Sequence, residues 1–142
     1  MKKYLVLFLL FFLFFPIGYR AVTYAQSSPV MFFCERYDPA YSEEVGISDR
    51  FTTGYLTVMV KADYALGLTK CYIQFDKYNP ANNDFEYYKK FNFVVKPDMK
   101  YIYFSQNENA DMKFDEPGIY RVFLLNSANK NVASALIEII PQ

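Results

Sequence analysis

Short apolar stretches that alternate with polar residues recur through most of this chain, and turn-forming residues separate them. Alternation with a period of two is typical of β-strands that have one buried and one exposed face. No stretch keeps an apolar period of 3.6 over ten or more positions, and no internal repeat is visible. The pattern predicts strands at residues 30–37, 55–61, 70–78, 85–95, 101–105, 119–125 and 133–140, with a brief pairing at 112–114.

The last two predicted strands form a hairpin around the polar turn at residues 126–131. Both faces of strand 119–125 are apolar, and Arg121 is its only polar side chain. A strand that is apolar on both faces is expected in the middle of its sheet. We therefore place this hairpin at the centre of the core.

The strand at residues 85–95 has an apolar side that is interrupted once, by Lys89. The side chains expected on that side are Phe85, Tyr87, Lys89, Phe91, Phe93 and Val95. The polar segments at residues 39–49 and 79–84 are expected to be surface loops, because they are rich in acidic and turn-forming residues. These two loops are candidates for a contact surface.

About seven strands with a turn every 8–15 residues suit an all-β fold, and we expect a two-sheet antiparallel β-sandwich. The chain has 142 residues, 53% of them hydrophobic, which is the size of one domain with a sizeable core. Residues 26–142 are therefore expected to form a single β-sandwich domain.

The first 25 residues are expected to be a signal peptide. Lys2 and Lys3 precede an unbroken apolar run at residues 5–15, which is shorter than the roughly 20 residues that a spanning helix needs. Small residues favour cleavage after Ala25, with Ala21 as the weaker alternative. The mature chain would then carry no membrane span and would be exported to the periplasm, the cell surface or the extracellular space.

One short run near the end of the chain resembles a known family. Residues Glu116-Pro117-Gly118-Ile119-Tyr120-Arg121-Val122 resemble the tyrosine-corner motif of immunoglobulin domains, in which an acidic residue, a glycine, a tyrosine and a cysteine follow each other at fixed spacing. The resemblance implies an immunoglobulin-like or fibronectin-like sandwich, with structural roles for Gly118 and Tyr120. It also implies that the Tyr120 hydroxyl bonds to backbone upstream. The chain departs from the motif in having no Trp and in having Val122 where those domains carry a cysteine.

Charge and composition disfavour several classes of function. Cleavage after Ala25 leaves 12 basic and 15 acidic residues, scattered rather than clustered, whereas nucleic-acid binding requires clustered cations. The chain has no His, which removes the commonest general base and the usual Ser-His and Cys-His arrangements. We therefore expect no enzyme, no catalytic residues, no cofactor and no nucleic-acid partner.

Cys34 and Cys71 are the two cysteines. In an exported chain two cysteines favour a disulfide, and closing this loop would stabilise the fold by roughly 3–4 kcal/mol. Each cysteine also lies in an apolar strand pattern, where a free thiol behaves as a small buried hydrophobe. The sequence leaves both alternatives open.

Acidic and amide side chains gather in the turn after the third predicted strand. Asp76, Asn79, Asn82 and Asp84 supply the oxygen ligands that calcium prefers. Their spacing does not reproduce an EF-hand loop, and the same residues are common in any turn. We expect a solvated turn and keep calcium binding as the alternative, with no other metal site.

Tyrosines at Tyr87, Tyr88, Tyr101 and Tyr103 are the remaining candidates for binding. Successive strand residues face opposite ways, so some of these rings must point to solvent. Exposed rings in a row bind sugars or protein partners. Tyrosine is also a good strand former at a sheet surface, and this second reading needs no ligand.

The hypothesis that combines these observations is an exported, non-catalytic β-sandwich module with a binding or structural role. Its partner would be an unidentified protein or glycan. One alternative is a protein inhibitor of proteases that presents loops from the sandwich. The other is a glycan-binding domain that uses surface tyrosines.

Overall fold

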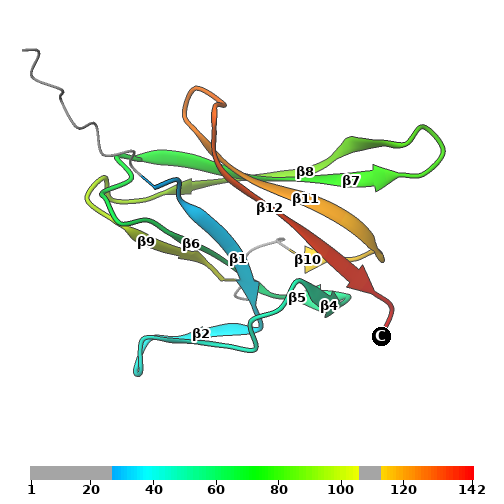
Figure 1. The fold of residues 1–142 in the computed structure, drawn as a ribbon, viewed down its shortest axis with the longest axis horizontal. Helices are drawn as coiled ribbons and strands as arrows, with labels where there is room; N and C mark the ends of the chain where they lie inside the picture. The colour runs from blue at the N-terminus through cyan, green and yellow to red at the C-terminus, as the bar shows by residue number, and fades with distance from the viewer. Residues whose placement is uncertain (1–26, 106–112) are drawn as a thin grey trace, which may run out of the picture.

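The computed structural model describes residues 27–105 and 113–142, and in these residues the regular structure consists of twelve β-strands (Figure 1). Their bounds are β1 Val30–Cys34, β2 Arg36–Asp38, β3 Glu43–Val45, β4 Arg50–Thr52, β5 Gly54–Tyr55, β6 Thr57–Lys61, β7 Lys70–Asn79, β8 Asp84–Val94, β9 Tyr101–Phe104, β10 Lys113–Phe114, β11 Gly118–Asn126 and β12 Asn131–Ile140. The predicted signal peptide lies outside the described residues. Within them, no helix is long and apolar enough to span a membrane.

The strands of the described part form four hydrogen-bonded sheets, whereas the sequence predicted two. The largest sheet has the order β4-β12-β11-β7-β8, and its pairs are antiparallel except for the parallel pair of β12 and β4. A second sheet has the order β1-β6-β9, and β10-β5 and β2-β3 form two-stranded sheets. The all-β prediction is confirmed, and the arrangement is compatible with a β-sandwich.

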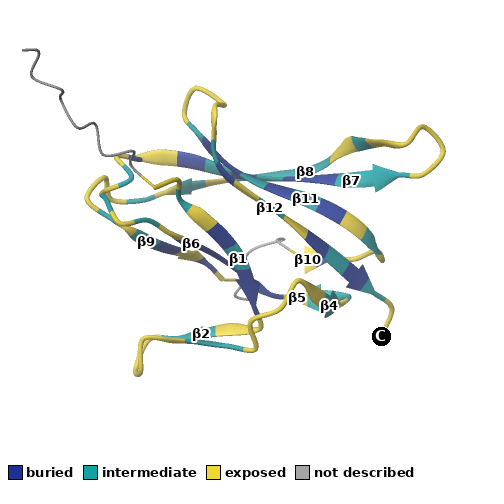
Figure 2. Ribbon diagram, in the orientation of Figure 1, coloured by how far each residue is buried: buried dark blue, intermediate teal, exposed yellow. Residues whose placement is uncertain are grey.

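The core contains inward side chains of both larger sheets, and the buried residues appear as dark blue bands along the strands in Figure 2. Phe33 and Val58 come from the three-stranded sheet, and Ile73, Val122 and Ile137 come from the five-stranded sheet; all are at most 1% exposed. Alternate residues of each strand point to this cluster, as the period of two predicted. Burying such side chains is the main stabilising contribution to a fold of this size.

The terminal hairpin lies where the sequence predicted it, because β11 is the middle strand of the five-stranded sheet. Tyr120, Val122 and Leu124 point into the core and are fully buried. The opposite face of β11 is less covered, and Ile119 on that face is 45% exposed. The apolar character of both faces therefore marks a central strand with one face in the core and one partly open to water.

The prediction of one strand at residues 30–37 is wrong in its second half. β1 ends at Cys34, and the chain leaves the sheet at Glu35 to form the β2–β3 hairpin. The strands of this hairpin pack against β9 through Tyr37, and its turn projects from the two larger sheets (Figure 1). The break before this hairpin could not be predicted, because Glu35 and Arg36 fit a polar strand face equally well.

The predicted faces of strand 85–95 are also wrong at its start. The β7–β8 register shifts between Phe75 and Asp76, so that Phe75 pairs with Lys89 and Asp76 pairs with Tyr87. Tyr88 is the extra residue of this β-bulge, and a bulge reverses the alternation on either side of it. Phe85 and Tyr87 therefore face away from the core, whereas the later aromatic residues of β8 pack against it.

Candidate functional site

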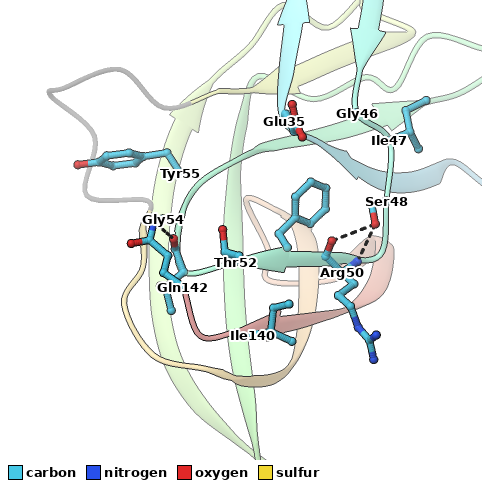
Figure 3. Close-up of a pocket in the computed structure, with 12 residues that line it drawn as sticks. Glu35, Gly46, Ile47, Ser48, Arg50, Thr52, Gly54, Tyr55, Ile140 and Gln142 are labelled. Carbon is cyan, nitrogen blue, oxygen red and sulfur yellow. Dashed lines mark hydrogen bonds between the residues drawn. The ribbon is translucent and has the colours of Figure 1, made fainter.

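An open cleft of about 720 Å³ lies at the end of the molecule where the chain passes from β3 to β5 and where β12 ends (Figure 3). We call it the end cleft. Its lining comprises Glu35, Gly46, Ile47, Ser48, Arg50, Phe51, Thr52, Thr53, Gly54, Tyr55, Ile140 and Gln142. Part of this lining falls in the loop at residues 39–49, one of the two loops that the sequence marks as candidates for a contact surface.

One wall of the end cleft depends on the close approach of Glu35 to Gly46. The Glu35 amide donates hydrogen bonds to the carbonyls of Val45 and Gly46, at 3.0 and 3.3 Å. Gly46 has a φ of +68°, and a Cβ at this position would lie 2.6 Å from Glu35 Cδ. Glycine is therefore required both by its backbone conformation and by the side chain that packs over it.

The floor of the end cleft is β4, which pairs in parallel with β12. Ser48 Oγ accepts a hydrogen bond from the Arg50 amide and donates one to the Arg50 carbonyl, both at 3.0 Å. The Arg50 guanidinium points to the other side and pairs with Glu138, with Nη2 to Oε2 at 2.6 Å. Both the backbone and the charge of Arg50 are therefore occupied within the chain.

Thr52 is the residue of β4 whose backbone faces the end cleft. The Asp49 carbonyl and the Thr53 amide bond to β12, and alternate residues of a strand turn their backbone groups to opposite sides. The N–H and C=O of Thr52 consequently point away from β12, towards the cleft that Thr52 lines. A short length of strand edge is thus presented to whatever enters the cleft.

Two exposed apolar side chains flank this edge. Tyr55 is 62% exposed and Ile47 is 60% exposed, and Figure 3 shows them at opposite ends of the cleft with Thr52 between them. Glu35 adds a carboxylate on the side opposite Thr52. This combination of backbone groups, apolar ends and one carboxylate suits recognition of an extended segment of polypeptide.

The tyrosines predicted for binding do not form one surface. Tyr101 and Tyr103 lie on the outer face of β9, where Tyr37 packs against them with ring centroids 5.5 and 4.4 Å away. Tyr88 turns inward and packs on Tyr120 at 5.4 Å, while Tyr87 is 66% exposed on the other sheet. The sequence did not identify Tyr37, because no local pattern indicates that the β2–β3 hairpin folds back onto β9.

Charged groups hold this hairpin in place. Glu44 accepts a hydrogen bond of 2.5 Å from the Tyr101 hydroxyl and pairs with Lys61 at 2.5 Å. These two donors lower the pKa of Glu44, and burial followed by the contact with Glu44 raises the pKa of Tyr101. Lys61 Nζ also lies 4.8 Å from the centroid of the Tyr101 ring, so ionic and cation–π contacts act together.

Three of the four candidate calcium ligands use a side-chain oxygen within the turn. Asn79 Oδ1 accepts from the Ala81 amide at 3.0 Å, Asn82 Oδ1 from the Asp84 amide at 3.2 Å, and Asp84 Oδ1 from the Phe85 amide at 2.7 Å. Asp76 lies apart from them and faces Arg121 at 3.5 Å. In the described residues, no group of three or more His, Cys, Asp or Glu side chains is placed to hold a metal ion. These contacts are the side-chain-to-backbone hydrogen bonds that Asn and Asp make in turns.

Cys34 and Cys71 are both buried free thiols in the structure. Cys71 belongs to the core cluster, whereas Cys34 lies on the face of the three-stranded sheet that is turned away from the core, since its neighbour Phe33 points inward. The sheet therefore separates them. Burial raises the pKa of each thiol to about 11, so neither is a thiolate at neutral pH.

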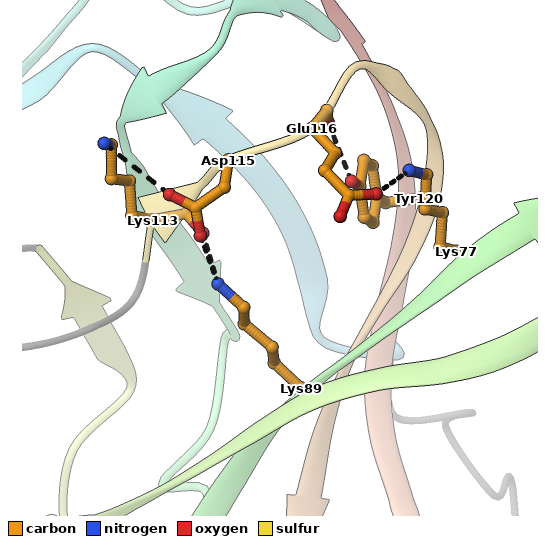
Figure 4. Close-up of polar contacts among 6 residues, drawn as sticks. All are labelled: Lys77, Lys89, Lys113, Asp115, Glu116 and Tyr120. Carbon is orange, nitrogen blue, oxygen red and sulfur yellow. Dashed lines mark hydrogen bonds and ion pairs between the residues drawn. The ribbon is translucent and has the colours of Figure 1, made fainter.

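The Tyr120 hydroxyl donates a hydrogen bond of 2.7 Å to the carbonyl oxygen of Glu116, the upstream contact that the resemblance implies (Figure 4). Lys77 pairs with the Glu116 carboxylate beside it. Gly118, which lies between Glu116 and Tyr120 in the sequence, has a φ of +150°, and a Cβ there would lie 3.0 Å from Lys77 Cε. Desolvation raises the pKa of Tyr120 above its ordinary range, so its hydroxyl remains a donor.

No protein-family model matches this chain, and no curated protein is similar to it in sequence.

Proposed function

We propose that this protein is an exported, non-catalytic β-sandwich module of the immunoglobulin-like type, and that it binds a protein partner through the end cleft. Two observations support the immunoglobulin-like arrangement. The core cluster joins the sheets β1-β6-β9 and β4-β12-β11-β7-β8. The Tyr120 hydroxyl makes the upstream backbone contact that characterises a tyrosine corner.

The end cleft carries the binding part of the proposal. It combines the outward backbone of Thr52 with the exposed side chains of Tyr55 and Ile47. An extended peptide gains affinity from main-chain hydrogen bonds to such an edge and specificity from side chains at its ends. The cleft offers one carboxylate, Glu35, and an arginine already paired with Glu138, a set that favours recognition over catalysis.

A capture experiment tests this proposal. The mature protein is immobilised, incubated with envelope extract of the cells that produce it, and cross-linked. We expect one predominant partner that the double variant Ile47→Ser/Tyr55→Ala no longer captures. The matched control is Tyr41→Ala, which removes a tyrosine that is 76% exposed on the β2–β3 hairpin. Equal capture by the double variant and the wild type would refute the role of the end cleft.

The inhibitor alternative has its own structural support. The turn of the β2–β3 hairpin stands out from the two larger sheets (Figure 1), with Tyr41 exposed and Ser42 in the left-handed region at a φ of +54°. A projecting loop with a defined backbone could enter a protease cleft. Inhibition assays against envelope and secreted proteases test it, and inhibition that Tyr41→Ala abolishes would favour it over the end cleft.

Glycan binding by surface tyrosines has less support. The candidate rings lie on different sheets, and Tyr103 stacks against Tyr37 instead of presenting an open platform. A glycan array tests this alternative. A signal that Tyr103→Ala removes would favour it.

A further inference from the structure

Strand β8 is the free edge of the five-stranded sheet in the described part of the chain, and β4 is the opposite edge. A free edge presents a row of N–H and C=O groups that can pair with another strand. β4 is short and Ser48 occupies the backbone of Arg50, whereas β8 is eleven residues long. β8 is therefore the longer of the two edge strands.

The β7–β8 register shows which residues of β8 turn their backbone groups to the free edge. The Val95 amide donates to the Thr69 carbonyl at 3.1 Å, which makes Thr69 and Val95 a hydrogen-bonded pair. In an antiparallel ladder these pairs alternate with pairs whose backbone groups point outward. The backbone groups of Lys90, Asn92 and Val94 are therefore turned to the free edge.

Residues 90–94 lack the features that normally keep an edge strand from pairing with another strand. The bulge at Tyr88 interrupts β8 before it and leaves residues 90–94 regular. Lys90 is turned over the sheet face, where its Nζ bonds Asn129 Oδ1 at 2.6 Å and lies 4.4 Å from the Tyr72 ring centroid. Val94, at the other end, is 80% exposed. Residues 90–94 therefore expose an apolar side chain at Val94, and the charge of Lys90 points away from the free edge.

We propose that β8 pairs antiparallel with β8 of a second copy of this chain, across a two-fold axis at Asn92. In this register Asn92 faces Asn92 of the second copy, and Lys90 faces its Val94. All three outward residues then pair, which allows about six main-chain hydrogen bonds. The two five-stranded sheets become one continuous sheet, and the contact is isologous as a closed dimer requires.

The side chains of β8 are self-complementary in this arrangement. The Asn92 side chain can hydrogen-bond to Asn92 of the second copy, because an amide both donates and accepts. Val94 of one copy covers the aliphatic stem of Lys90 of the other. This self-complementarity favours a second copy over an unrelated strand, and the end clefts on the opposite edge stay open.

Sedimentation equilibrium of the mature protein from micromolar to sub-millimolar concentration tests the proposal. We expect the wild type to reach the mass of two chains. Asn92→Pro removes the outward N–H without breaking the pairing of β8 with β7, because proline is tolerated where the N–H faces solvent. We expect this variant to be a monomer with an unchanged circular dichroism spectrum. If it fails to fold, Val94→Lys, which places a lysine opposite Lys90, is expected to be a monomer instead.

Disulfide trapping tests the proposed register of the two β8 strands. Cα atoms of a directly opposed hydrogen-bonded pair are about 5.5 Å apart, within the range that a disulfide spans. Under mild oxidation Asn92→Cys is expected to form a covalent dimer, and Ser127→Cys, on the exposed β11–β12 turn, is expected to remain monomeric. A monomeric wild type at every concentration would overturn the proposal. A dimer that survives both Asn92→Pro and Val94→Lys would also overturn it.

Discussion

The Tyr120 hydroxyl and the Glu116 carbonyl oxygen are joined by a hydrogen bond of 2.7 Å at the start of β11, and the Tyr120 side chain is fully buried. Tyr120 also packs edge-on against Phe114 of β10, with centroids 5.0 Å apart. One side chain therefore fixes both the connection that leads into the central strand and its packing in the core.

Replacing this tyrosine with phenylalanine keeps the ring and deletes the donor. We expect Tyr120→Phe to lower the free energy of unfolding by about 1–3 kcal/mol, because the Glu116 carbonyl loses its partner. Urea unfolding followed by circular dichroism measures this. Tyr41→Phe, at an exposed position, is the matched control and is expected to change stability by less than about 0.5 kcal/mol. Equal stability of the two variants would contradict a structural role for the hydroxyl.

The central strand could be predicted from the sequence because its signal is local. Residues 119–125 are apolar on both faces, a pattern that is expected of a strand in the middle of its sheet. The reversal of Phe85 and Tyr87 could not be predicted, because it depends on the bulge at Tyr88. A bulge is fixed by the partner strand, which the alternation of a single strand does not describe.

The end cleft was predicted only in part for a similar reason. The loop at residues 39–49 is polar and irregular enough to indicate a surface, but Thr52 and Gln142 come from segments about 90 positions apart in the chain. They meet because β4 pairs with β12 in parallel. No periodicity in either segment indicates this long-range pairing.

Glu44 gives docking of the β2–β3 hairpin a defined pH dependence. Its pKa is lowered in the folded state by the hydrogen bonds from Lys61 and Tyr101. A carboxyl group whose folded-state pKa is lowered contributes stability above its unfolded-state pKa, ordinarily 4.5, and that stability is lost as the pH falls through the folded-state value. We expect the ring resonances of Tyr37 to move towards random-coil positions as the pH falls below about 4.5.

Two variants separate this effect from general acid unfolding. Glu44→Gln is expected to abolish the transition of the Tyr37 resonances and to leave the hairpin more weakly docked at neutral pH. Glu43→Gln, at the exposed neighbouring position, is expected to keep the transition. A transition that persists in Glu44→Gln would assign the docking to another group.

Burial of both thiols predicts their reactivity. We expect neither Cys34 nor Cys71 to be alkylated by iodoacetamide in the native protein, because each is buried with a pKa of about 11. Unfolding in denaturant without a reductant is expected to give two alkylated cysteines by mass spectrometry. Labelling that requires prior reduction would show instead that the cysteines are bridged.

The proposed export predicts the start of the mature chain. We expect Lys2, Lys3 and the apolar run at residues 5–15 to act as a signal peptide that is cleaved after Ala25. Protein recovered from the envelope or the medium is expected to begin at Gln26 when its N-terminus is sequenced. Recovery of the chain in the cytoplasm with residues 1–25 still attached would contradict export.

Photo-cross-linking from position 47 in living cells tests the proposed function most directly. A photoreactive amino acid replaces Ile47 at the end cleft, Tyr41 on the β2–β3 hairpin or Ser127 on the β11–β12 turn. We predict an adduct of one discrete mass from position 47 and none from position 127. An adduct from position 41 alone, or no adduct from position 47, would contradict the account of the end cleft as the binding site.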